Sequence, residues 1–571
     1  LVFNLDVIST YNSKLITTIK PPIFKNVNKY IKLRNSVLKQ LNIINGSNKN
    51  HYNRNFNSLI NLINKCKTPM GKRRLNNTLL MPVKDTHFLK KEYDIIQHFI
   101  DNYEKYDSLL HHFKDIKDID FICRKFNGER FCPYDLFLLY STILESQSVY
   151  DKISGDKVIE EYLSDNKHLL EVDKELESTI KLLEKYVKFD IISNVSDSDI
   201  YSINFFKETE ETKEVFDLCD VRSELYNKLN KEKFYLSKCI DNQVIKLKKK
   251  VDKHDNMKLH SPEKTPPFLK LTSTKANYLK KYLNNSKVIT DANYKVVSKG
   301  KSGYMVESPT LNKLYRKIFD CEDKFSKLSK KVFKRVVNEI KKNTNTMYNI
   351  SEYISIIDSV MTKAIVSKKY NYCKPEIHYS TNVDAGDNVD DVDDPEYECE
   401  DEVKSYLNVN GLRHPLVEHL LENEVFTAND ISIGEDNNDV RLIYGVNAVG
   451  KSVLMKSIGL CIFMAQVGMF VPATTMKFKP YTQIFTRIIG NDNMFKGQST
   501  FTVEMTELCT IINNADENSL ILGDELCSGT ERQSAILLFM GSLKHISRMG
   551  SSCIFTTHYH ELKDYLNMND Y

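Results

Sequence analysis

One short segment near the carboxyl end constrains the fold of this chain more than any other feature. An apolar strand, residues 442–444, runs into Gly445, and after four intervening residues the chain reads Gly450-Lys451-Ser452 before a helical pattern begins. The two glycines let the backbone curl so that its N–H groups point inward at phosphate oxygens. The following helix presents the positive end of its dipole to the same anion. This order predicts a nucleotide-phosphate site in a parallel α/β domain.

The polar side chains around this loop have distinct expected roles. Lys451 supplies a positive charge to the β and γ phosphates, and the Ser452 hydroxyl is suited to bind Mg²⁺. A second apolar strand, 519–522, leads to Asp524 and Glu525 at the sheet edge where ligands bind. We expect Asp524 to hold Mg²⁺ through water or through Ser452, and Glu525 to orient or deprotonate the attacking water. Without the phosphate loop, these two acids would indicate only an ordinary strand-end turn.

A third apolar strand ends at Thr556-Thr557-His558. A histidine just past a strand is usually only a polar loop residue, but beside a phosphate loop His558 is placed to sense the γ-phosphate. His560 and Glu561 follow it and form a pattern that resembles a metal site. We interpret this pair as polar residues at a helix start, because no third ligand with fitting spacing is present.

Length and composition set wide limits. The 571 residues correspond to roughly three to five domains at about 100–200 residues each. A net charge of +4 indicates no partner by itself.

The twelve cysteines form no CxxC pair, which suits a reducing, intracellular compartment and argues against a disulfide framework or zinc. There is no run of about 18 apolar residues, so we expect no membrane span. The chain opens with Leu1 and stops at Tyr571 within a helical pattern, and we interpret it as an internal fragment of a longer protein.

The part of the chain before residue 379 is predicted to be mainly helical. Apolar residues at three- and four-residue spacing predict a helical core domain over 1–207. Residues 208–263 hold almost no Gly or Pro in their first fifty positions and predict a lever helix, and residues 305–378 predict the returning lever helices. Between them, residues 264–304 contain β-branched residues and Gly turns, which predict a small α/β clamp at the lever tip.

The composition changes again towards the carboxyl end. Eleven acids within 384–402 predict that residues 379–404 form an acidic, mobile linker. From residue 405 to 571, short apolar strands alternate with helices, which predicts the ATPase domain with an incomplete carboxyl end. The predicted fold class is therefore α/β plus all-α. It combines a P-loop (ABC-type) ATPase domain around a parallel sheet with a helical core, long lever helices and a small α/β clamp.

Several segments resemble the MutS family of DNA mismatch repair ATPases, in the family's order and at its spacing. The ATPase part carries FMAQVGMFVPA (463–473), IFTRIIGNDNMFKGQSTFTVEM (484–505), LGDELCSGT (522–530) and FTTHYHEL (555–562). The helical part carries CKTPMGKRRLNNTLLMPVKDT (66–86). This resemblance spans nearly the whole chain. It implies core, lever, clamp and ATPase domains, ATP and Mg²⁺ as cofactors, double-stranded DNA and downstream repair factors as partners, and no membrane partner.

The resemblance also implies residues that spacing does not. MutS proteins form homo- or heterodimers in which each nucleotide site is completed by the second subunit. Ser499 matches the serine that reaches the γ-phosphate in the partner, and Phe426 matches a residue bordering the adenine. The implied nucleotide-binding set is Gly445, Asn447, Gly450, Lys451, Ser452, Val453 and Phe426.

The phosphate loop departs from the family pattern at three positions. Val446 replaces the usual Pro, and Ala448–Val449 replace the usual Met–Gly, which makes the loop bulkier. After Gly529–Thr530 the chain reads ERQSA instead of the familiar STxDG. This second departure puts any interface contacts at that position in doubt, but not the hydrolytic residues.

The clamp carries a basic surface. Between Lys264 and Tyr304 there are nine lysines and one acid, Asp291. A lysine-rich face is often only solvated, but at a lever tip it is suited to neutralise DNA phosphates without reading bases. The predicted DNA-backbone contacts are Lys270, Lys275, Lys280, Lys281, Lys295, Lys299 and Lys301.

We therefore expect an ATP-dependent clamp that binds mispaired DNA and initiates mismatch repair. Nothing in the chain matches the amino-terminal mismatch reader of the family, so a recombination factor that binds DNA junctions stays open as an alternative. A chromosome ATPase of the ABC/SMC type is a second alternative, but its LSGGQ-type signature and sustained heptads are missing. A catalytically idle scaffold is disfavoured because Lys451 and Glu525 are both present.

Overall fold

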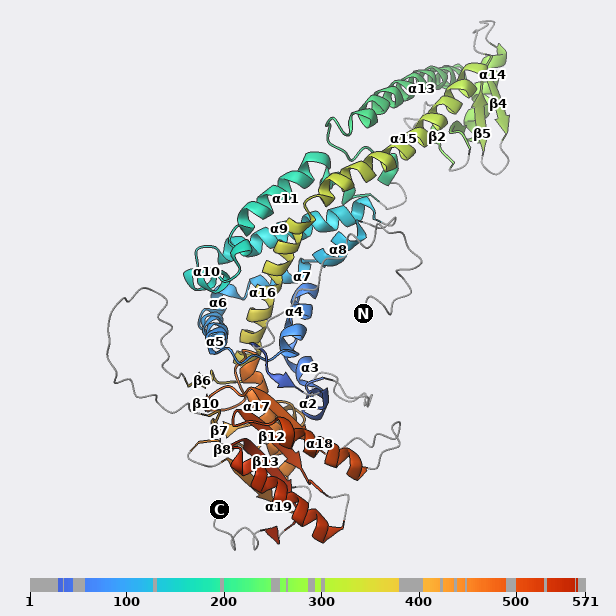
Figure 1. Cartoon of the computed structure of the whole chain (residues 1–571). Coiled ribbons are helices and arrows are strands. Elements are labelled where there is room, and N and C mark those ends of the chain that lie inside the picture. The colour runs from blue at the N-terminus through green and yellow to red at the C-terminus, as the bar shows by residue number, and fades with distance from the viewer. Residues whose placement is uncertain are drawn as a thin grey trace, which may run out of the picture. The chain divides into compact units, whose positions relative to one another are not determined.

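In the computed structural model the chain folds into two compact units. Figure 1 shows the whole chain, coloured by residue number from blue to red. The first comprises Leu1–Ser108, Asp156–Tyr162 and Ser355–Tyr571, and the second comprises Leu109–Gly155 and Leu163–Ile354. The structure describes residues 29–33, 35–44, 57–126, 131–195, 200–247, 257–262, 265–285, 293–298, 303–378, 404–421, 425–435, 439–446, 449–488, 500–527, 531–559 and 561–562.

A five-stranded parallel sheet forms the centre of the first unit. Its strands, in spatial order, are β1 (Lys32–Leu33), β11 (Gln483–Arg487), β12 (Ser519–Asp524), β13 (Ser552–Thr557) and β9 (Val440–Tyr444). All six positions of β12 and of β13 are buried, which is typical of central strands covered on both faces. The strand that precedes the phosphate loop, β9, lies at one edge and pairs with β13.

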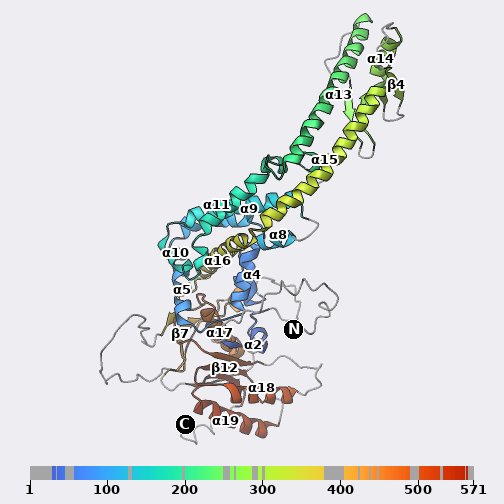
Figure 2. The same cartoon turned by 45° about the horizontal axis from the view of Figure 1, so that its top comes forward.

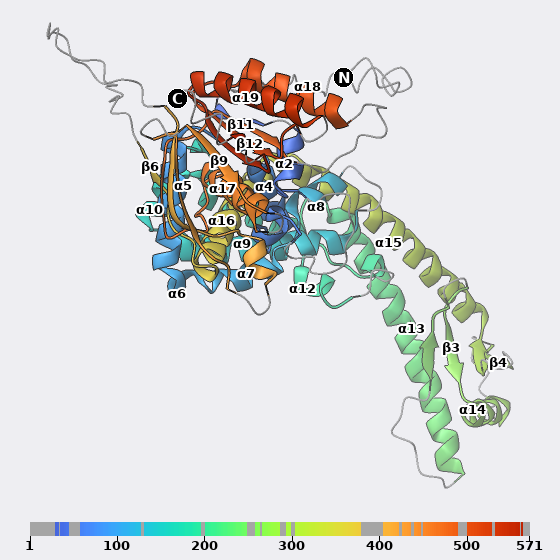
Figure 3. The same cartoon turned by 90° about the horizontal axis from the view of Figure 1, so that it is seen from below.

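Helices cover both faces of this sheet, namely α17 (Lys451–Gln466), α18 (Thr500–Asn514) and α19 (Arg532–Arg548). Figure 3 shows α18 and α19 together on one side of the strands and α17 on the other. Phe539 of α19 packs with Ile521 and Phe555 in one apolar cluster. On the opposite face, a Cβ added to Gly459 of α17 would lie 2.6 Å from Leu522. Neighbouring strand residues point to opposite faces, so Ile521 and Leu522 serve different layers.

A second sheet in the same unit has four strands, in the order β6 (Glu376–Ile377), β10 (Thr475–Phe478), β7 (Leu407–Leu412) and β8 (Asn429–Ile433). β7 pairs antiparallel with both β10 and β8, whereas β6 runs parallel to β10. A bulge interrupts β7 at Gly411, whose φ is 62°. A Cβ at Gly411 would lie 2.2 Å from the hydroxyl of Thr474, so the position requires glycine.

The remaining helices of the first unit are short, apart from α5 and α16. They are α2 (Asn35–Gln40), α3 (Leu59–Ile63), α4 (Pro69–Leu79), α5 (Thr86–Asp101), α6 (Tyr103–Tyr106), the 3-10 helix η8 (Val417–His419) and part of α16 (Thr344–Lys369). α4 begins after Thr68, whose hydroxyl accepts the N–H of Gly71 at 2.9 Å. The buried carboxylate of Asp358 in α16 accepts the Thr68 N–H at 2.8 Å and its hydroxyl at 2.7 Å. Burial raises the pKa of Asp358, and the hydrogen bonds from Thr68 oppose this shift.

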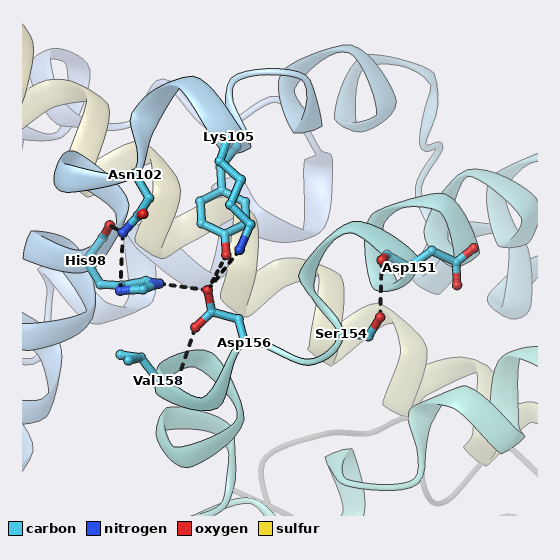
Figure 4. Close-up of polar contacts among 8 residues, drawn as sticks. His98, Asn102, Lys105, Asp151, Ser154, Asp156 and Val158 are labelled. Carbon is cyan, nitrogen blue, oxygen red and sulfur yellow. Dashed lines mark hydrogen bonds and ion pairs between the residues drawn. The ribbon is translucent and has the colours of Figure 1, made fainter.

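Asp156 holds a short segment of the chain to the first unit (Figure 4). Its carboxylate accepts hydrogen bonds from His98 at 3.0 Å, from Lys105 at 3.3 Å and from the hydroxyl of Tyr106. It also accepts a backbone N–H of α10 (Lys157–Leu163) at 3.2 Å. Burial alone would raise the pKa of Asp156, but these hydrogen bonds outweigh it and hold the pKa well below its usual value.

The second unit is built mainly from helices. Its shorter helices are α7 (Leu109–Asp115), α8 (Ile119–Lys125), α9 (Pro133–Ile153), η5 (Lys167–Leu169), α11 (Val172–Tyr186), α12 (Phe189–Ile192) and η6 (Ile200–Ser202). The ring of Tyr140 in α9 stacks on Phe189 of α12 at a centroid distance of 4.0 Å. Within the described residues, no helix is both long and apolar enough to cross a membrane.

Two long helices, α13 (Lys213–Lys246) and α15 (Pro309–Lys341), lie side by side in Figures 1 and 2. The guanidinium of Arg222 in α13 lies 5.1 Å from the ring centroid of Phe325 in α15 and 3.8 Å from the carboxylate of Glu322. α15 begins after Ser308, whose hydroxyl caps the helix by accepting the Leu311 N–H at 3.1 Å. These helices lie within the two segments that the sequence analysis predicted as levers.

A small antiparallel sheet lies at one end of this helix pair (Figure 2). Its strands, in spatial order, are β2 (Lys258–His260), β3 (Phe268–Leu271), β5 (Tyr304–Glu307) and β4 (Lys295–Ser298), and helix α14 (Ser273–Asn285) packs beside it. The hydroxyl of Tyr315 in α15 accepts the N–H of Leu269 at 3.1 Å and donates to the carbonyl of Val306 at 3.3 Å. This tyrosine therefore ties the small sheet to α15.

Three predicted boundaries differ from the structure. Residues 29–108 belong to the unit that contains the central sheet, and β1 is a strand of that sheet, so 1–207 is not one helical core. The lever helix ends at Lys246 and not at residue 263, because Lys258–His260 pairs with β3 in the clamp sheet. That sheet also extends past residue 304 to Glu307. Strands of two to four residues are too short to show a clear periodicity in the sequence, which explains why β1, β2 and the end of β5 were not predicted. The acidic segment 379–404 lies outside the described residues except for Lys404.

Candidate nucleotide site

The phosphate loop begins where β9 ends, at Tyr444. Gly450 has a φ of 96° and occupies the N-cap position of α17, a conformation that glycine adopts without strain. A Cβ on Gly445 would lie 3.0 Å from Val449, so the loop backbone is tightly folded there. Asn447 and Ala448 lie outside the described residues. The helix dipole of α17 and its first N–H groups face this loop.

Lys451 lies over its own loop. Its side chain is largely buried, and its ammonium group donates to the carbonyl oxygens of Gly445 at 2.6 Å and Val446 at 3.1 Å. The same group approaches Nε2 of His558 to 3.4 Å. Lys451 thus brings a cation close to the carboxyl end of β9 and to His558, which follows β13.

Asp524 ends β12 directly opposite Thr556 of β13. The Thr556 hydroxyl donates to the Asp524 carboxylate, and both side chains are buried. Ser452 and Val453 lie in the first turn of α17 with half-buried side chains. One turn further along, burial lowers the pKa of Lys456, and the charge of Asp524 opposes this shift. The Thr556 hydroxyl is a residue beside Asp524 that the sequence reasoning missed, since its position depends on the register of β12 and β13.

Glu525 follows in a left-handed backbone conformation, with a φ of 49°. Its N–H donates to the carbonyl of Thr556 at 3.1 Å. Its carboxylate lies 2.5 Å from Nε2 of His558 and therefore accepts the proton of that nitrogen. Because this nitrogen already donates to Glu525, the approach of Lys451 is a contact and not a second hydrogen bond. Lys451 at the start of α17 meets Glu525 and His558, which follow β12 and β13, and this arrangement can bind an anion beside a general base.

Four further residues that the sequence analysis singled out are Phe426, Ser499, His560 and Glu561. Phe426 is half-buried and precedes β8. Ser499 and His560 lie outside the described residues. Glu561 lies 2.5 Å from the guanidinium of Arg532. In the part of the chain that the structure describes, no three His, Cys, Asp or Glu side chains gather as a metal site would require.

The predicted DNA-contacting lysines lie on three elements of the clamp. Lys270 is on β3 and Lys295 on β4, whereas Lys275, Lys280 and Lys281 are on α14. Lys280, Lys281 and Lys295 are exposed, and the ammonium of Lys280 lies 5.3 Å from the ring centroid of Tyr304. Lys299 and Lys301 lie outside the described residues.

Two family models match the chain. The model of MutS domain III matches residues 36–364, more than half of the chain, and the model of MutS domain V matches residues 441–570. The chain is 27% identical over 619 aligned positions to a mutS homolog of Acanthamoeba polyphaga mimivirus, which covers 99% of this chain and 52% of that protein.

Other relatives have similar names and coverage. The DNA mismatch repair protein MutS of Clostridioides difficile is 27% identical, with 90% of this chain and 48% of that protein covered. A mitochondrial mutS homolog of Sarcophyton glaucum is 26% identical, with 88% and 47% covered. The chain therefore spans about half the length of the curated relatives it matches. The matches to both domains, together with the mixed helical and α/β architecture, show that the chain belongs to the MutS family of DNA mismatch repair proteins.

Proposed function

We propose that this chain is the core, lever, clamp and ATPase part of an ATP-dependent DNA clamp that binds mispaired DNA and initiates mismatch repair. The observation that carries this proposal is the meeting of Lys451, at the start of α17, with Glu525 and His558, which follow β12 and β13. Relatives that are named as mismatch repair proteins support a role in mismatch repair over the alternative of a chromosome ATPase.

The proposed reaction is hydrolysis of ATP. The N–H groups of the phosphate loop and Lys451 bind the β and γ phosphates, while Glu525 accepts the proton of the attacking water. His558 holds the Glu525 carboxylate in place through its 2.5 Å contact, and its proposed role is to sense the γ-phosphate. When bound, Mg²⁺ would neutralise charge on the β and γ phosphates. The Ser452 hydroxyl and the Asp524 carboxylate fit this ion, since both are oxygen donors at the strand edge and α17 start.

Three further roles are part of the proposal. Asn447 contributes to the phosphate loop, and Phe426 borders the adenine. Ser499 reaches the γ-phosphate of a second MutS-type subunit, so that a homo- or heterodimer forms two composite sites. ATP binding at these sites would change the subunit interface, and hydrolysis would reset it.

The clamp is proposed to contact the DNA backbone. Exposed lysines on α14 and β4 fit phosphate neutralisation, which depends on salt but not on base sequence. No segment of this chain resembles the family's mismatch reader, so we assign recognition of the mispair to another segment of the full-length protein. Downstream repair factors would then act on the ATP-bound clamp. A junction-binding recombination factor is the alternative that an experiment must separate.

The deciding experiment compares three DNAs with the full-length protein: a homoduplex, the same duplex with one G·T mispair, and a four-way junction. Each is titrated at about physiological salt with and without ATP. Preferred binding to the mispair, converted by ATP into a form that slides off open DNA ends, is the expected result. Equal affinity for both duplexes together with tight junction binding would overturn the mismatch-sensor proposal in favour of the recombination alternative.

A further inference from the structure

The turn that follows β12 carries unusual backbone geometry. Glu525 has a φ of 49° and Cys527 a φ of 66°. Both are non-glycine residues in the left-handed region, where the Cβ of an L-residue meets backbone atoms and strains the chain. Such a conformation persists only when surrounding contacts fix it. Since Glu525 carries the proposed general base, whatever fixes this turn also positions that carboxylate.

The first half of the turn is fixed by the neighbouring strand. The Glu525 N–H donates to the backbone carbonyl of Thr556 at 3.1 Å and lies 3.3 Å from its hydroxyl. These contacts come from β13, the strand that also leads to His558. The fixed N–H explains how Glu525 is oriented, but it leaves the second left-handed residue without support from the sheet.

Glu504 fixes the second half. Its Oε1 accepts the N–H of Cys527 at 2.7 Å, and its side chain is only 2% exposed. The Cys527 carbonyl in turn accepts the hydroxyl of Tyr559 at 3.3 Å. Burying a carboxylate is energetically unfavourable unless it accepts strong hydrogen bonds. The hydrogen bond from the Cys527 N–H therefore stabilises the buried Glu504 carboxylate as well as the turn. Burial raises the pKa of the Cys527 thiol to about 11, with the nearby Glu504 charge adding to the shift, so this cysteine is not a nucleophile.

Glu504 comes from a different layer of the unit. It lies on α18, the helix whose first residue, Thr500, directly follows Ser499 in the chain. The carboxylate therefore joins α18 to the turn of the proposed general base. A movement at the start of α18 would reach Glu525 through two peptide units and one hydrogen bond.

We propose that Glu504 is a positioning residue for ATP hydrolysis: it holds Cys527 in its left-handed conformation and thereby orients Glu525. This inference rests on the proposed function, because it assigns a role within the same nucleotide site. Unlike the proposed function, it predicts that a Glu504 variant has a less ordered turn even when no nucleotide is bound.

The first measurement is amide hydrogen exchange of the nucleotide-free protein. In Glu504→Ala the amide of Cys527 has no carboxylate to donate to, so peptides covering 525–527 should exchange at least about fivefold faster. Glu504→Gln keeps an acceptor oxygen and should lie closer to the unmodified protein. Glu507→Ala is the matched control, since Glu507 is one turn further along α18 and pairs with Arg487 at 3.3 Å instead. Unchanged exchange at 525–527 in Glu504→Ala would overturn the proposal.

The second measurement separates binding from hydrolysis. Glu504→Ala should lower kcat for ATP at least about tenfold, since small misplacements of catalytic groups have effects of that size. The KM should change by less than about threefold, because Lys451 and the phosphate loop are untouched. Glu507→Ala should keep both constants. A Glu504→Ala protein that binds nucleotide normally and keeps its kcat would contradict the proposal.

The decisive variant combines Glu504→Ala with Cys527→Gly. Glycine adopts a φ of 66° without the strain of a Cβ, so this change should restore part of the missing kcat if Glu504 acts through the turn. No recovery would show that Glu504 does not act by holding residue 527. If the unmodified protein hydrolyses no ATP at all, the proposed function fails. The exchange measurement then still decides whether Glu504 holds the turn.

Discussion

The ammonium group of Lys363 lies 2.6 Å from the carboxylate of Glu92, and both side chains are almost completely buried, at 2% and 6% exposed. Lys363 also donates to the carbonyl oxygens of Val467 and Gly468, each at 3.2 Å, just beyond the end of α17. The hydroxyl of Tyr162 donates to the other carboxylate oxygen of Glu92, Oε1. One buried ion pair thus joins α16, α5 and the carboxyl end of the phosphate-loop helix.

Replacing Lys363 by Met should destabilise the first unit by about 3–5 kcal/mol, because Glu92 would keep a buried charge without a partner. The measurement is the free energy of unfolding from urea titration at neutral pH. Lys374→Ala is the control: it breaks a 2.7 Å pair with Asp94 that is half exposed, and such pairs contribute less than about 1 kcal/mol. Equal losses in the two variants would contradict the importance of burial.

Two glycines should respond in opposite directions to alanine. A Cβ on Gly541, in the exposed middle of α19, meets nothing within 4 Å, so Gly541→Ala should stabilise the protein by about 0.5–1 kcal/mol through helix propensity. A Cβ on Gly523 in β12 would lie 2.3 Å from the ring of Phe555. Gly523→Ala should therefore destabilise it by about 1–3 kcal/mol through overpacking. Thermal unfolding midpoints of both variants test this, and a stabilising Gly523→Ala would show that the Phe555 ring can move away without cost.

The sequence predicts well those features that lie within one short window. The strand, Gly loop and helix around Lys451 are consecutive, and the carboxyl ends of parallel strands must share one sheet edge. For that reason the proximity of Lys451, Glu525 and His558 could be anticipated from their positions after three apolar strands. The α15 lever was equally visible, because a 33-residue helix repeats its apolar stripe many times.

Features that depend on distant pairing could not be anticipated. β1 is two residues long and pairs with β11, about 450 residues later in the chain. β2 has three residues and lies within 208–263, the segment predicted to form lever helix. The role of Glu504 required knowing that Cys527 is left-handed, and only the folded turn reveals that backbone angle. In each case the physical cause is a tertiary contact that leaves no local pattern.

His414 should make stability depend on pH. It is 4% exposed, and its Nδ1 accepts the N–H groups of Leu416 and Val417, both at 3.2 Å. Burial, with the positive charge of Lys456, lowers its pKa from 6.5 to about 4. The folded pKa lies below the unfolded value, so the stabilisation is fully present above pH 6.5 and is lost as pH falls towards 4. Because the pKa falls from 6.5 to about 4 on folding, the free energy of unfolding should decrease by roughly 3 kcal/mol over this range.

The matched variant for this prediction is His414→Asn, whose Oδ1 can accept the same N–H groups but does not titrate. Urea midpoints of both proteins are compared between pH 7.5 and pH 4.5. The unmodified protein should lose more stability over this range than the variant does. Identical pH profiles would show that His414 does not supply this dependence.

Exposed clamp lysines should determine the salt dependence of DNA binding. Replacing Lys280, Lys281 and Lys295 by Ala should reduce the slope of log affinity against log salt by about 0.9 for each DNA phosphate that the variant no longer neutralises. The ratio of mispaired to homoduplex affinity should stay constant, because phosphate contacts carry no sequence information. Lys181→Ala is the control, since that lysine is exposed on α11 and pairs with Glu177 at 2.8 Å. A changed mispair ratio with an unchanged salt slope would contradict a backbone role for these lysines.

The proposed roles of Lys451 and Glu525 can be separated by two variants at the same site. Glu525→Gln keeps the side chain's size but cannot accept a proton from water, so kcat for ATP should fall by about 10²–10⁴-fold while nucleotide binding persists. Lys451→Met removes the cation that lies against the loop carbonyls and should weaken nucleotide binding itself. Equilibrium binding of a fluorescent ATP analogue and steady-state hydrolysis are measured on both proteins. If Glu525→Gln kept its kcat, the general base would have to be another group, and His558, which lies 2.5 Å from Glu525, would be the next residue to replace.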